Sequence, residues 1–308
     1  MEHEPAGRTI LVTGATGLVG RALVAALAAS GTTVIALTRD VRNAAHVIGH
    51  PRVRCIPRLT DLQDDTAIDA VVHLAGARVL DKRWTPARWQ VLLRSRTDLA
   101  NEIVAFARRA KRPPRVLVSA SAVSYYGASG AAHRVESDLP AGRDDASQFC
   151  VQIEAAATRA RDLGIRVVPL RLGIVLARED GALPPLAASA RFGLGAELGS
   201  GQQPVSWIHL DDAVRLIRFA LDSEALAGPI NAVAPETPTQ SDFIRAVAAR
   251  FGRRVCLRVP RAALGLLLGE RSALLLEGQW AVPRAALDAG FTFRHPTLAS
   301  ALGDLLPR

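Results

Sequence analysis

The stretch Thr9-Ile10-Leu11-Val12-Thr13-Gly14-Ala15-Thr16-Gly17-Leu18-Val19-Gly20 near the amino terminus decides the fold. Its first five residues are a short, branched apolar run typical of a buried strand, and residues 17–30 have the spacing of an amphipathic helix. Between them, one glycine permits a tight turn, a second lets the backbone approach a pyrophosphate, and a third lets the helix pack closely on the sheet. The helix N-terminus favours anionic phosphates. The pattern predicts a dinucleotide-binding turn made by Gly14, Thr16, Gly17, Leu18, Val19 and Gly20.

Downstream, short apolar runs alternate with helical patterns. The expected strands are residues 33–37, 70–74, 115–119 and 165–172, and the expected helices include residues 84–110 and 148–163. Strands alternating with helices predict βαβ units, and hence an α/β fold with a Rossmann-type, doubly wound parallel sheet. We expect residues 1–175, with 206–234 returning to them, to form the dinucleotide-binding domain. Residues 176–205 and 235–308 then form a smaller, mostly helical substrate lobe.

The end of the second expected strand indicates which dinucleotide binds. A site that prefers NAD carries an acidic residue there, which holds the ribose 2′-hydroxyl. This chain has Leu37-Thr38-Arg39-Asp40 instead. Thr38 and Arg39 leave room for a 2′-phosphate, and the Arg39 guanidinium can pair with it. We therefore expect NADP(H), with NAD(H) as the alternative if Asp40 is the ribose ligand.

Composition excludes several classes of protein. Of the 308 residues, 49% are apolar, which is ample for a buried core, and no apolar run is long enough to span a membrane. The net charge of +9 comes from scattered arginines, without the clustered basic face of a nucleic-acid-binding protein. The polar, acidic amino terminus lacks the features of a signal peptide, so we expect a cytoplasmic protein.

The three cysteines, Cys55, Cys150 and Cys256, stand alone and far apart. This spacing predicts neither a disulfide framework nor a metal site. We expect all three to be small buried side chains.

Beyond the glycine turn, several segments resemble the extended short-chain dehydrogenase/reductase superfamily. They are His73-Leu74-Ala75-Gly76, Ser119-Ala120-Ser121, Tyr125-Tyr126-Gly127, Pro169-Leu170-Arg171 with Gly173, and Trp207-Ile208-His209-Leu210-Asp211-Asp212. The resemblance implies a cofactor that lies along Leu74, Ala75, Gly76, Ser119, Ala120, Pro169, Arg171 and Gly173. It also implies a small-molecule substrate and a homodimer formed through two helices that flank the sheet.

The chain is also similar, over nearly its whole length, to a narrower bacterial family of sugar-nucleotide-epimerase-like proteins with a C-terminal domain of unknown function. The segments that carry this similarity include Asp81-Lys82-Arg83-Trp84, Arg94-Ser95-Arg96, Gly199-Ser200-Gly201, Asn231-Ala232-Val233-Ala234-Pro235-Glu236 and residues 274–279. Some members of the family carry the label of cell-division inhibitor, which implies no chemical mechanism.

The catalytic pair that the superfamily uses is missing. Those enzymes carry Tyr-x-x-x-Lys on a helix beside the nicotinamide, with the tyrosine as acid/base and the lysine lowering its pKa. The only tyrosines here are Tyr125 and Tyr126, and no lysine follows Lys111. On the corresponding helix, either Phe149 and Ile153 or Cys150 and Glu154 take the spacing of the pair. We interpret Cys150 as a packed side chain and Glu154 as a surface residue.

Other groups must then move the proton if the protein is an enzyme. The catalytic candidates are Ser121, Tyr125, Tyr126 and Lys82, and the substrate-side candidates are Trp84, Trp207 and His209. His209 is equally well interpreted as a core histidine bonded to Asp211 or Asp212. The leading hypothesis is an NADP(H)-dependent oxidoreductase that acts on an unidentified small substrate. The alternatives are a non-catalytic NADP(H)-binding regulatory module and a nucleotide-sugar epimerase or dehydratase.

Overall fold

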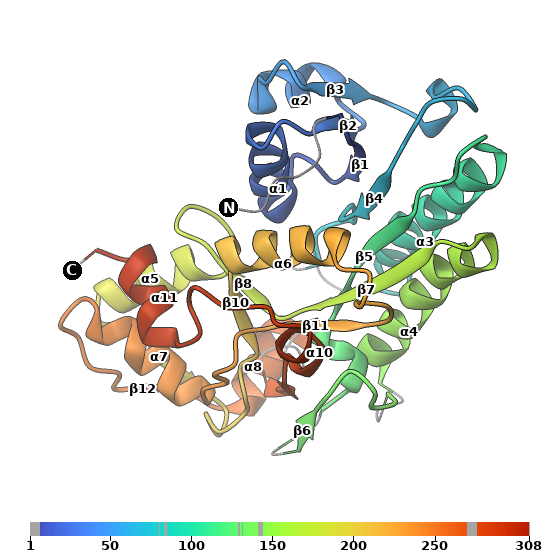
Figure 1. The fold of residues 1–308 in the computed structure, drawn as a ribbon. Coiled ribbons are helices and arrows are strands. Elements are labelled where there is room, and N and C mark those ends of the chain that lie inside the picture. Colours follow the sequence, from blue (N-terminus) through green and yellow to red (C-terminus); the bar gives the residue numbers. More distant parts are fainter. Residues whose placement is uncertain are drawn as a thin grey trace.

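A seven-stranded sheet forms the centre of the protein, in a computed structural model that describes residues 7–79, 81–82, 85–128, 130, 132–140, 144–269 and 276–307 (Figure 1). Every neighbouring pair of its strands is parallel, in the order β11-β7-β5-β4-β1-β2-β3. The strands are β1 (Thr9–Thr13), β2 (Thr33–Leu37), β3 (Val53–Ile56), β4 (Ala70–His73), β5 (Val116–Ala122), β7 (Arg166–Leu172) and β11 (Ile230–Ala232). The parallel, doubly wound sheet predicted from the sequence is confirmed.

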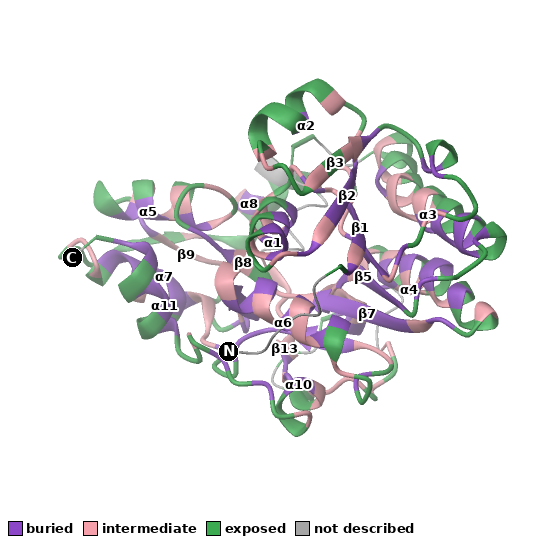
Figure 2. Ribbon diagram, turned by 45° about the horizontal axis from the view of Figure 1, so that its top comes forward, coloured by how far each residue is buried: buried purple, intermediate pink, exposed green. Residues whose placement is uncertain are grey.

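Helices cover both faces of the sheet, and the alternation of side chains along the strands assigns each residue to one face. In β1, Ile10 and Val12 point into the core under α1 (Leu18–Ala29) and α6 (Leu210–Asp222). Leu11 points the other way, into the core under α3 (Pro86–Arg109) and α4 (Asp145–Thr158). Burial on both faces explains why these strands are continuous apolar runs (Figure 2).

The strand order creates the place where a ligand binds. From β1 the chain builds outward through β2 to β3, and then crosses back to place β4 on the other side of β1. The direction in which the chain adds strands to the sheet therefore reverses between β1 and β4. In open α/β sheets, ligands bind at such a switch point, beyond the carboxyl ends of the strands.

The second half of the chain adds a lobe beside the sheet (Figure 1). Its helices include α5 (Leu183–Arg191), α7 (Gln240–Ala249), α8 (Arg261–Leu268) and α11 (Leu298–Leu305), while α10 (Arg284–Asp288) packs against β11 of the sheet. Short parallel pairs join β8 (Ile174–Leu176) to β10 (Trp207–His209), β9 (Ala196–Leu198) to β12 (Leu257–Val259), and β6 (His133–Arg134) to β13 (Trp280–Ala281). The side chains of α5, α7 and α11 pack round Trp207 in a core of their own.

Some local predictions need correction. The sequence reading omitted β3 and α2 (Val41–Ile48), and it placed the start of α4 three residues late, at 148 instead of Asp145. Of the cysteines, Cys150 is buried, whereas Cys55 is half-buried and Cys256 is exposed. Cys256 is exposed because it precedes β12, a short strand that is itself mostly exposed.

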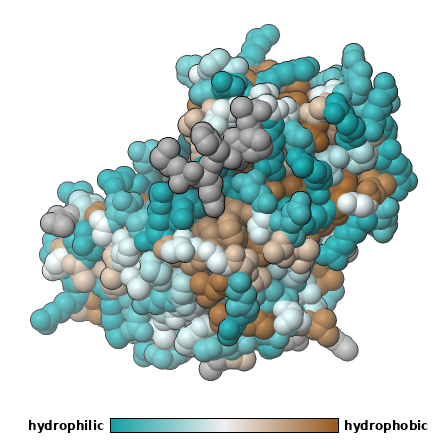
Figure 3. Space-filling model, in the orientation of Figure 1, coloured by the Kyte–Doolittle hydropathy of each residue, from teal (hydrophilic) through white to brown (hydrophobic). Residues whose placement is uncertain are grey.

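The surface is largely hydrophilic, and apolar side chains on the face drawn in Figure 3 gather toward its middle. No helix among the described residues is long and apolar enough to cross a membrane.

Gly20 offers a direct test of how closely α1 packs on the glycine turn. A β carbon at Gly20 would lie 2.1 Å from the Gly14 carbonyl oxygen, so Gly20→Ala should lower the free energy of unfolding by about 1–3 kcal/mol. Gly303→Ala is the control: Gly303 lies inside α11 with nothing within 4 Å of its added β carbon, so alanine there should stabilise by about 0.5–1 kcal/mol. Urea denaturation measures both. Equal stability of Gly20→Ala and the wild type would contradict this packing.

Candidate functional site

The glycine turn has the geometry of a phosphate-binding loop. Gly14 has a φ of +71°, and a β carbon there would lie 2.7 Å from the backbone nitrogen of Ala75, so only glycine fits. Gly17 is the N-cap of α1 and donates its N–H to the Gly14 carbonyl at 3.0 Å. No side chain caps this helix among the described residues, which leaves the N–H groups of Leu18 and Val19 available to an anion. Thr16 lies half-buried in the same turn.

The carboxyl end of β2 holds the residues that the sequence predicts beside the cofactor ribose. Asp40, the alternative ribose ligand, is the N-cap of α2, and its Oδ1 accepts the N–H of Asn43 at 3.0 Å. Arg39 is exposed and forms no ion pair or hydrogen bond with the described residues. Thr38 is half-buried, and its backbone N–H donates to the Ile56 carbonyl. The cap of α2 therefore uses one carboxylate oxygen of Asp40, whereas Arg39 has no partner among the described residues.

Arg58 is a second arginine at this edge, which sequence reasoning missed. Leu37 of β2 pairs with Ile56 of β3, so Arg39 and Arg58 each follow their strand by two residues. Both are exposed. Arg58 could be identified from the sequence only if β3 were first recognised as the parallel neighbour of β2.

Hydrogen bonds fix the loop after β4 against β1. The Thr13 hydroxyl donates to Nδ1 of His73 at 2.8 Å and accepts the N–H of Ala75 at 3.2 Å. His73 Nε2–H donates to the Arg96 carbonyl at 3.2 Å. Burial lowers the pKa of His73 to about 4, so the ring is neutral and this tautomer is maintained at neutral pH. Leu74, Ala75 and Gly76 therefore follow β4 as a rigid loop at the switch point.

A buried ion pair occupies the region of the missing catalytic pair. Arg171 on β7 contacts Glu154 on α4 through two hydrogen bonds of 3.0 Å, one to each carboxylate oxygen. Their side chains are 3% and 11% exposed. Burial opposes the charge on Arg171, but Glu154 outweighs that effect and raises the pKa of the guanidinium. The interpretation of Glu154 as a surface residue is wrong, because Arg171 requires an anion inside the protein.

The same ion pair engages two of the catalytic candidates. The Ser121 hydroxyl donates to Glu154 Oε1 at 2.7 Å. Arg171 also donates to the Tyr126 hydroxyl at 2.8 Å, and that hydroxyl donates to Asn231 Oδ1 at 2.8 Å. Tyr126 is fully buried, and burial raises its pKa to about 12. These contacts give the hydroxyls of both Ser121 and Tyr126 hydrogen-bond partners within the protein.

Tyr125 differs from Tyr126. Its side chain is half-buried, its ring lies 3.4 Å from the Arg171 guanidinium, and its hydroxyl has no hydrogen-bond partner among the described residues. It belongs to η2 (Val123–Tyr126), which follows the carboxyl end of β5. Tyr125 is therefore the tyrosine whose hydroxyl is available for proton transfer.

The remaining cofactor candidates line the carboxyl halves of β5 and β7. Ser119 is buried and Ala120 is half-buried, while Pro169 is buried and pairs with Ser119 across the two strands. At Gly173 a β carbon would lie 2.7 Å from the Ser206 carbonyl oxygen, so this glycine permits the close approach of the chain before β10. Arg171 is only 2% exposed and is fully used by the contacts above, so its predicted place along the cofactor is not supported.

Cys150 and Ile153 on α4 are both buried, and burial raises the pKa of the Cys150 thiol to about 12. The thiol is therefore protonated and unreactive at neutral pH, as a packed cysteine should be. Phe149 is half-buried and lies 5.2 Å from the Trp89 ring.

The substrate-side candidates lie in different places. Lys82 is exposed, and Trp84 lies outside the described residues. Trp207 is fully buried in the core of the second lobe, so the prediction that it contacts substrate is not supported.

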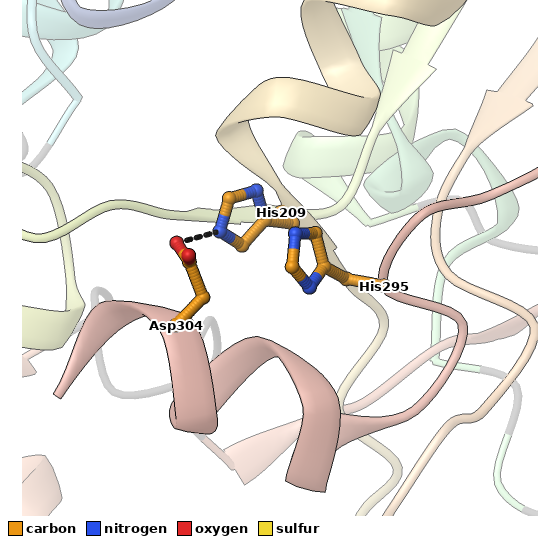
Figure 4. A group of neighbouring side chains, drawn as sticks. All are labelled: His209, His295 and Asp304. Atoms are coloured by element: carbon orange, nitrogen blue, oxygen red, sulfur yellow. Dashed lines mark hydrogen bonds and ion pairs between the residues drawn. The ribbon is translucent and has the colours of Figure 1, made fainter.

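His209 is the N-cap of α6 (Figure 4). Its Nδ1 accepts the N–H of Asp211 at 3.0 Å, which leaves Nε2 to carry the proton and donate to Asp304 at 3.3 Å. Its ring stacks on that of His295, with centroids 3.9 Å apart. The potential ligand atoms of these three residues lie within 4.8 Å of one another, as in a metal site. However, both nitrogens of neutral His209 are already used, which favours the interpretation as a structural histidine bonded to Asp211.

Glu154→Gln tests the central ion pair. The change leaves the Arg171 guanidinium buried without an anion, which should cost about 3–5 kcal/mol of unfolding free energy. The control is Glu277→Gln in the exposed pair with Arg261, where the change should be about 0.5 kcal/mol or less. Chemical denaturation measures both. A loss at Glu154 as small as that at Glu277 would show that Arg171 does not depend on this carboxylate.

The comparisons with known proteins agree with this geometry. The model of the NAD dependent epimerase/dehydratase family matches residues 10–232, and that of a domain of unknown function, DUF1731, matches residues 259–305. Epimerase family protein Mb2239 of Mycobacterium bovis is 37% identical over 303 residues, which are 97% of each chain. The chloroplastic SDR39U1 homolog of Arabidopsis thaliana is 35% identical over 303 residues, which cover 97% of this chain and 86% of that protein.

Among solved structures, human epimerase family protein SDR39U1 (isoform 2), crystallised with NADPH, superposes with a TM-score of 0.85. It is 31% identical, and the match covers 96% of this chain and 98% of the human chain. The resemblances stated from the sequence are thereby confirmed, and the chain belongs to the NAD-dependent epimerase/dehydratase family, as a member with a C-terminal DUF1731 segment.

Proposed function

We propose that this protein binds NADP(H) at the carboxyl edge of β1, β2 and β4 and transfers hydride to or from a small substrate. The observation that carries the cofactor assignment is at the end of β2. Asp40 caps α2 through its Oδ1, while Arg39 and Arg58 are two exposed cations at the same level of neighbouring strands. A 2′-phosphate is a dianion that two guanidiniums recognise well, and a 2′-hydroxyl gains little from them.

The human relative crystallised with NADPH supports the same choice of cofactor. In this chain the diphosphate would lie at the N-terminus of α1, where Gly14, Gly17 and Gly20 keep the backbone accessible. When bound, NADPH would supply the hydride and NADP⁺ would accept it. The chain itself contributes the rigid turn, the loop of Leu74, Ala75 and Gly76, and the Arg39 charge.

Cofactor preference is tested by titrating NADPH and NADH into the wild type and Arg39→Ala by calorimetry. The wild type should bind NADPH at least tenfold more tightly than NADH. Arg39→Ala should lose about tenfold in NADPH affinity, about 1.4 kcal/mol, with NADH affinity unchanged. Arg108→Ala, an exposed arginine on α3, is the control and should change neither. Equal affinities of the wild type for the two cofactors would contradict the proposal.

For the hydride step, Tyr125 is the proposed proton donor, because its hydroxyl has no hydrogen-bond partner in the described part of the chain, whereas that of Tyr126 has two. We expect Tyr125→Phe to lower kcat by about 100-fold for any aldehyde, ketone or nucleotide sugar that wild-type protein reduces with NADPH. NADPH affinity should not change, because the tyrosine acts on the substrate. NADPH oxidation at 340 nm measures the rate, and unchanged turnover in Tyr125→Phe would remove Tyr125 from the mechanism.

A second function, that of a non-catalytic NADP(H)-binding module, is favoured by one observation. The helix that carries the superfamily's acid/base pair here holds a closed ion pair, with Glu154 committed to Arg171. Tight NADPH binding together with no turnover on all three substrate classes would support this second function over the first.

A further inference from the structure

Arg96 on α3 is a largely buried cation without an anion among the described residues. One terminal nitrogen donates to the Leu92 carbonyl at 3.0 Å, and the other donates to the Ala77 carbonyl at 3.2 Å. Neither acceptor is charged, and Arg96 takes part in no ion pair within the described part of the chain. Burial lowers the pKa of its guanidinium, so the site is less favourable to the charge than water is. A cation in this situation is stabilised by an anion that arrives from solution.

The position of Arg96 connects it with the cofactor loop. A β carbon at Gly76 would lie 2.4 Å from the central carbon of the Arg96 guanidinium, so the guanidinium packs directly on the backbone of that loop. The Arg96 backbone is fixed as well, because its carbonyl accepts the hydrogen bond from His73. A side chain at position 76 would therefore clash with the Arg96 guanidinium, in addition to any clash with the expected dinucleotide.

Two aromatic side chains, Phe149 and Trp89, lie close to the guanidinium. The Phe149 ring centroid lies 5.3 Å from the central carbon of Arg96, within the range of a cation–π contact, and Trp89 lies 5.2 Å beyond Phe149. All three side chains are partly exposed, so a ligand can reach them. Phe149 also stands at one of the two positions on α4 that match the tyrosine of the superfamily's catalytic pair. Arg96 is therefore a cation at the reacting end of the expected site.

The cofactor's diphosphate is not the anion that this site would take. The diphosphate is expected at the N-terminus of α1, and α1 and α3 cover opposite faces of the sheet. Arg96 approaches Gly76 from the α3 side. The anion that fits is a planar carboxylate, which a guanidinium binds through two parallel hydrogen bonds.

Resting on the NADP(H) function proposed above, we propose that Arg96 binds a carboxylate of the substrate, whose apolar part lies against Phe149 and Trp89. The substrate class is then an aromatic or otherwise apolar carboxylic acid. In this arrangement Arg96 supplies the positive charge that the missing lysine does not, but it acts on the substrate rather than on a tyrosine.

Benzoate is the probe for this site, and benzamide is its uncharged counterpart of nearly the same shape. Calorimetry with the full chain, with and without saturating NADP⁺, should show saturable benzoate binding and at least tenfold weaker benzamide binding. Arg96→Gln should weaken benzoate binding at least tenfold, to the level of benzamide. Arg94→Gln is the matched control, since Arg94 is exposed on the same helix and makes no hydrogen bond with the described residues.

Two further measurements separate the possible failures. Arg96→Lys keeps the charge but not the paired hydrogen bonds, so its benzoate affinity should lie between those of the wild type and Arg96→Gln. The circular dichroism spectrum of Arg96→Gln should match that of the wild type, which shows that the variant is folded. A loss of NADPH affinity in Arg96→Gln with benzoate affinity unchanged would assign Arg96 to the cofactor and overturn the proposal.

Absence of saturable benzoate binding to the wild type, or equal binding to Arg96→Gln, would also overturn the proposal. Failure of NADPH to bind the wild type contradicts the proposed function instead. The benzoate titration without cofactor still decides the role of Arg96 in that case, because Arg96, Gly76 and Phe149 are in place without it.

Discussion

A guanidinium that is buried away from water needs an anion beside it, and Arg171 is such a buried guanidinium. Glu154 supplies the anion from α4. The Tyr126 hydroxyl accepts a further hydrogen bond from Arg171 and donates its own to Asn231 on β11. One side chain on β7 thereby joins a helix, the turn after β5 and the last strand of the sheet. The buried charge of Arg171 therefore limits which residue types can occupy the positions around it.

This requirement explains why the usual catalytic pair is absent. If Cys150 and Glu154 stand at the positions of the tyrosine and lysine, a lysine at 154 would put a second cation against Arg171. The carboxylate at 154 instead accepts hydrogen bonds from Arg171 and from Ser121, and so engages both side chains inside the protein. The cofactor-binding half of the site is separate from this network. It depends on Gly14 and Gly20, because the backbone of Ala75 lies too close to Gly14, and that of Gly14 too close to Gly20, for either position to carry a side chain.

The fold was largely predictable because its determinants are local. A branched apolar run followed by Gly14, Gly17 and Gly20 is a short-range pattern, and burial of each strand on both faces makes the strands continuous in sequence. Short, half-exposed β3 has no such pattern, and its omission also hid Arg58.

The network round Arg171 was not predictable, because its partners are distant in the sequence. Glu154 lies 17 residues from Arg171, and Tyr126 lies 105 residues from Asn231. A glutamate on a helix is usually a surface residue, and only the three-dimensional position of Arg171 shows otherwise. The same is true of Trp207, whose aromatic side chain near a strand end is typical of a binding site but here fills a core.

We propose that a dinucleotide with a 2′-phosphate binds across the switch point between β1 and β4. Hydrogen–deuterium exchange of the full chain with NADPH, with NADH and without cofactor tests it most directly. NADPH should slow the exchange of amides in residues 14–20, 38–40 and 74–77, and NADH should give less protection at 38–40. Unchanged exchange in residues 14–20 with saturating NADPH would contradict it.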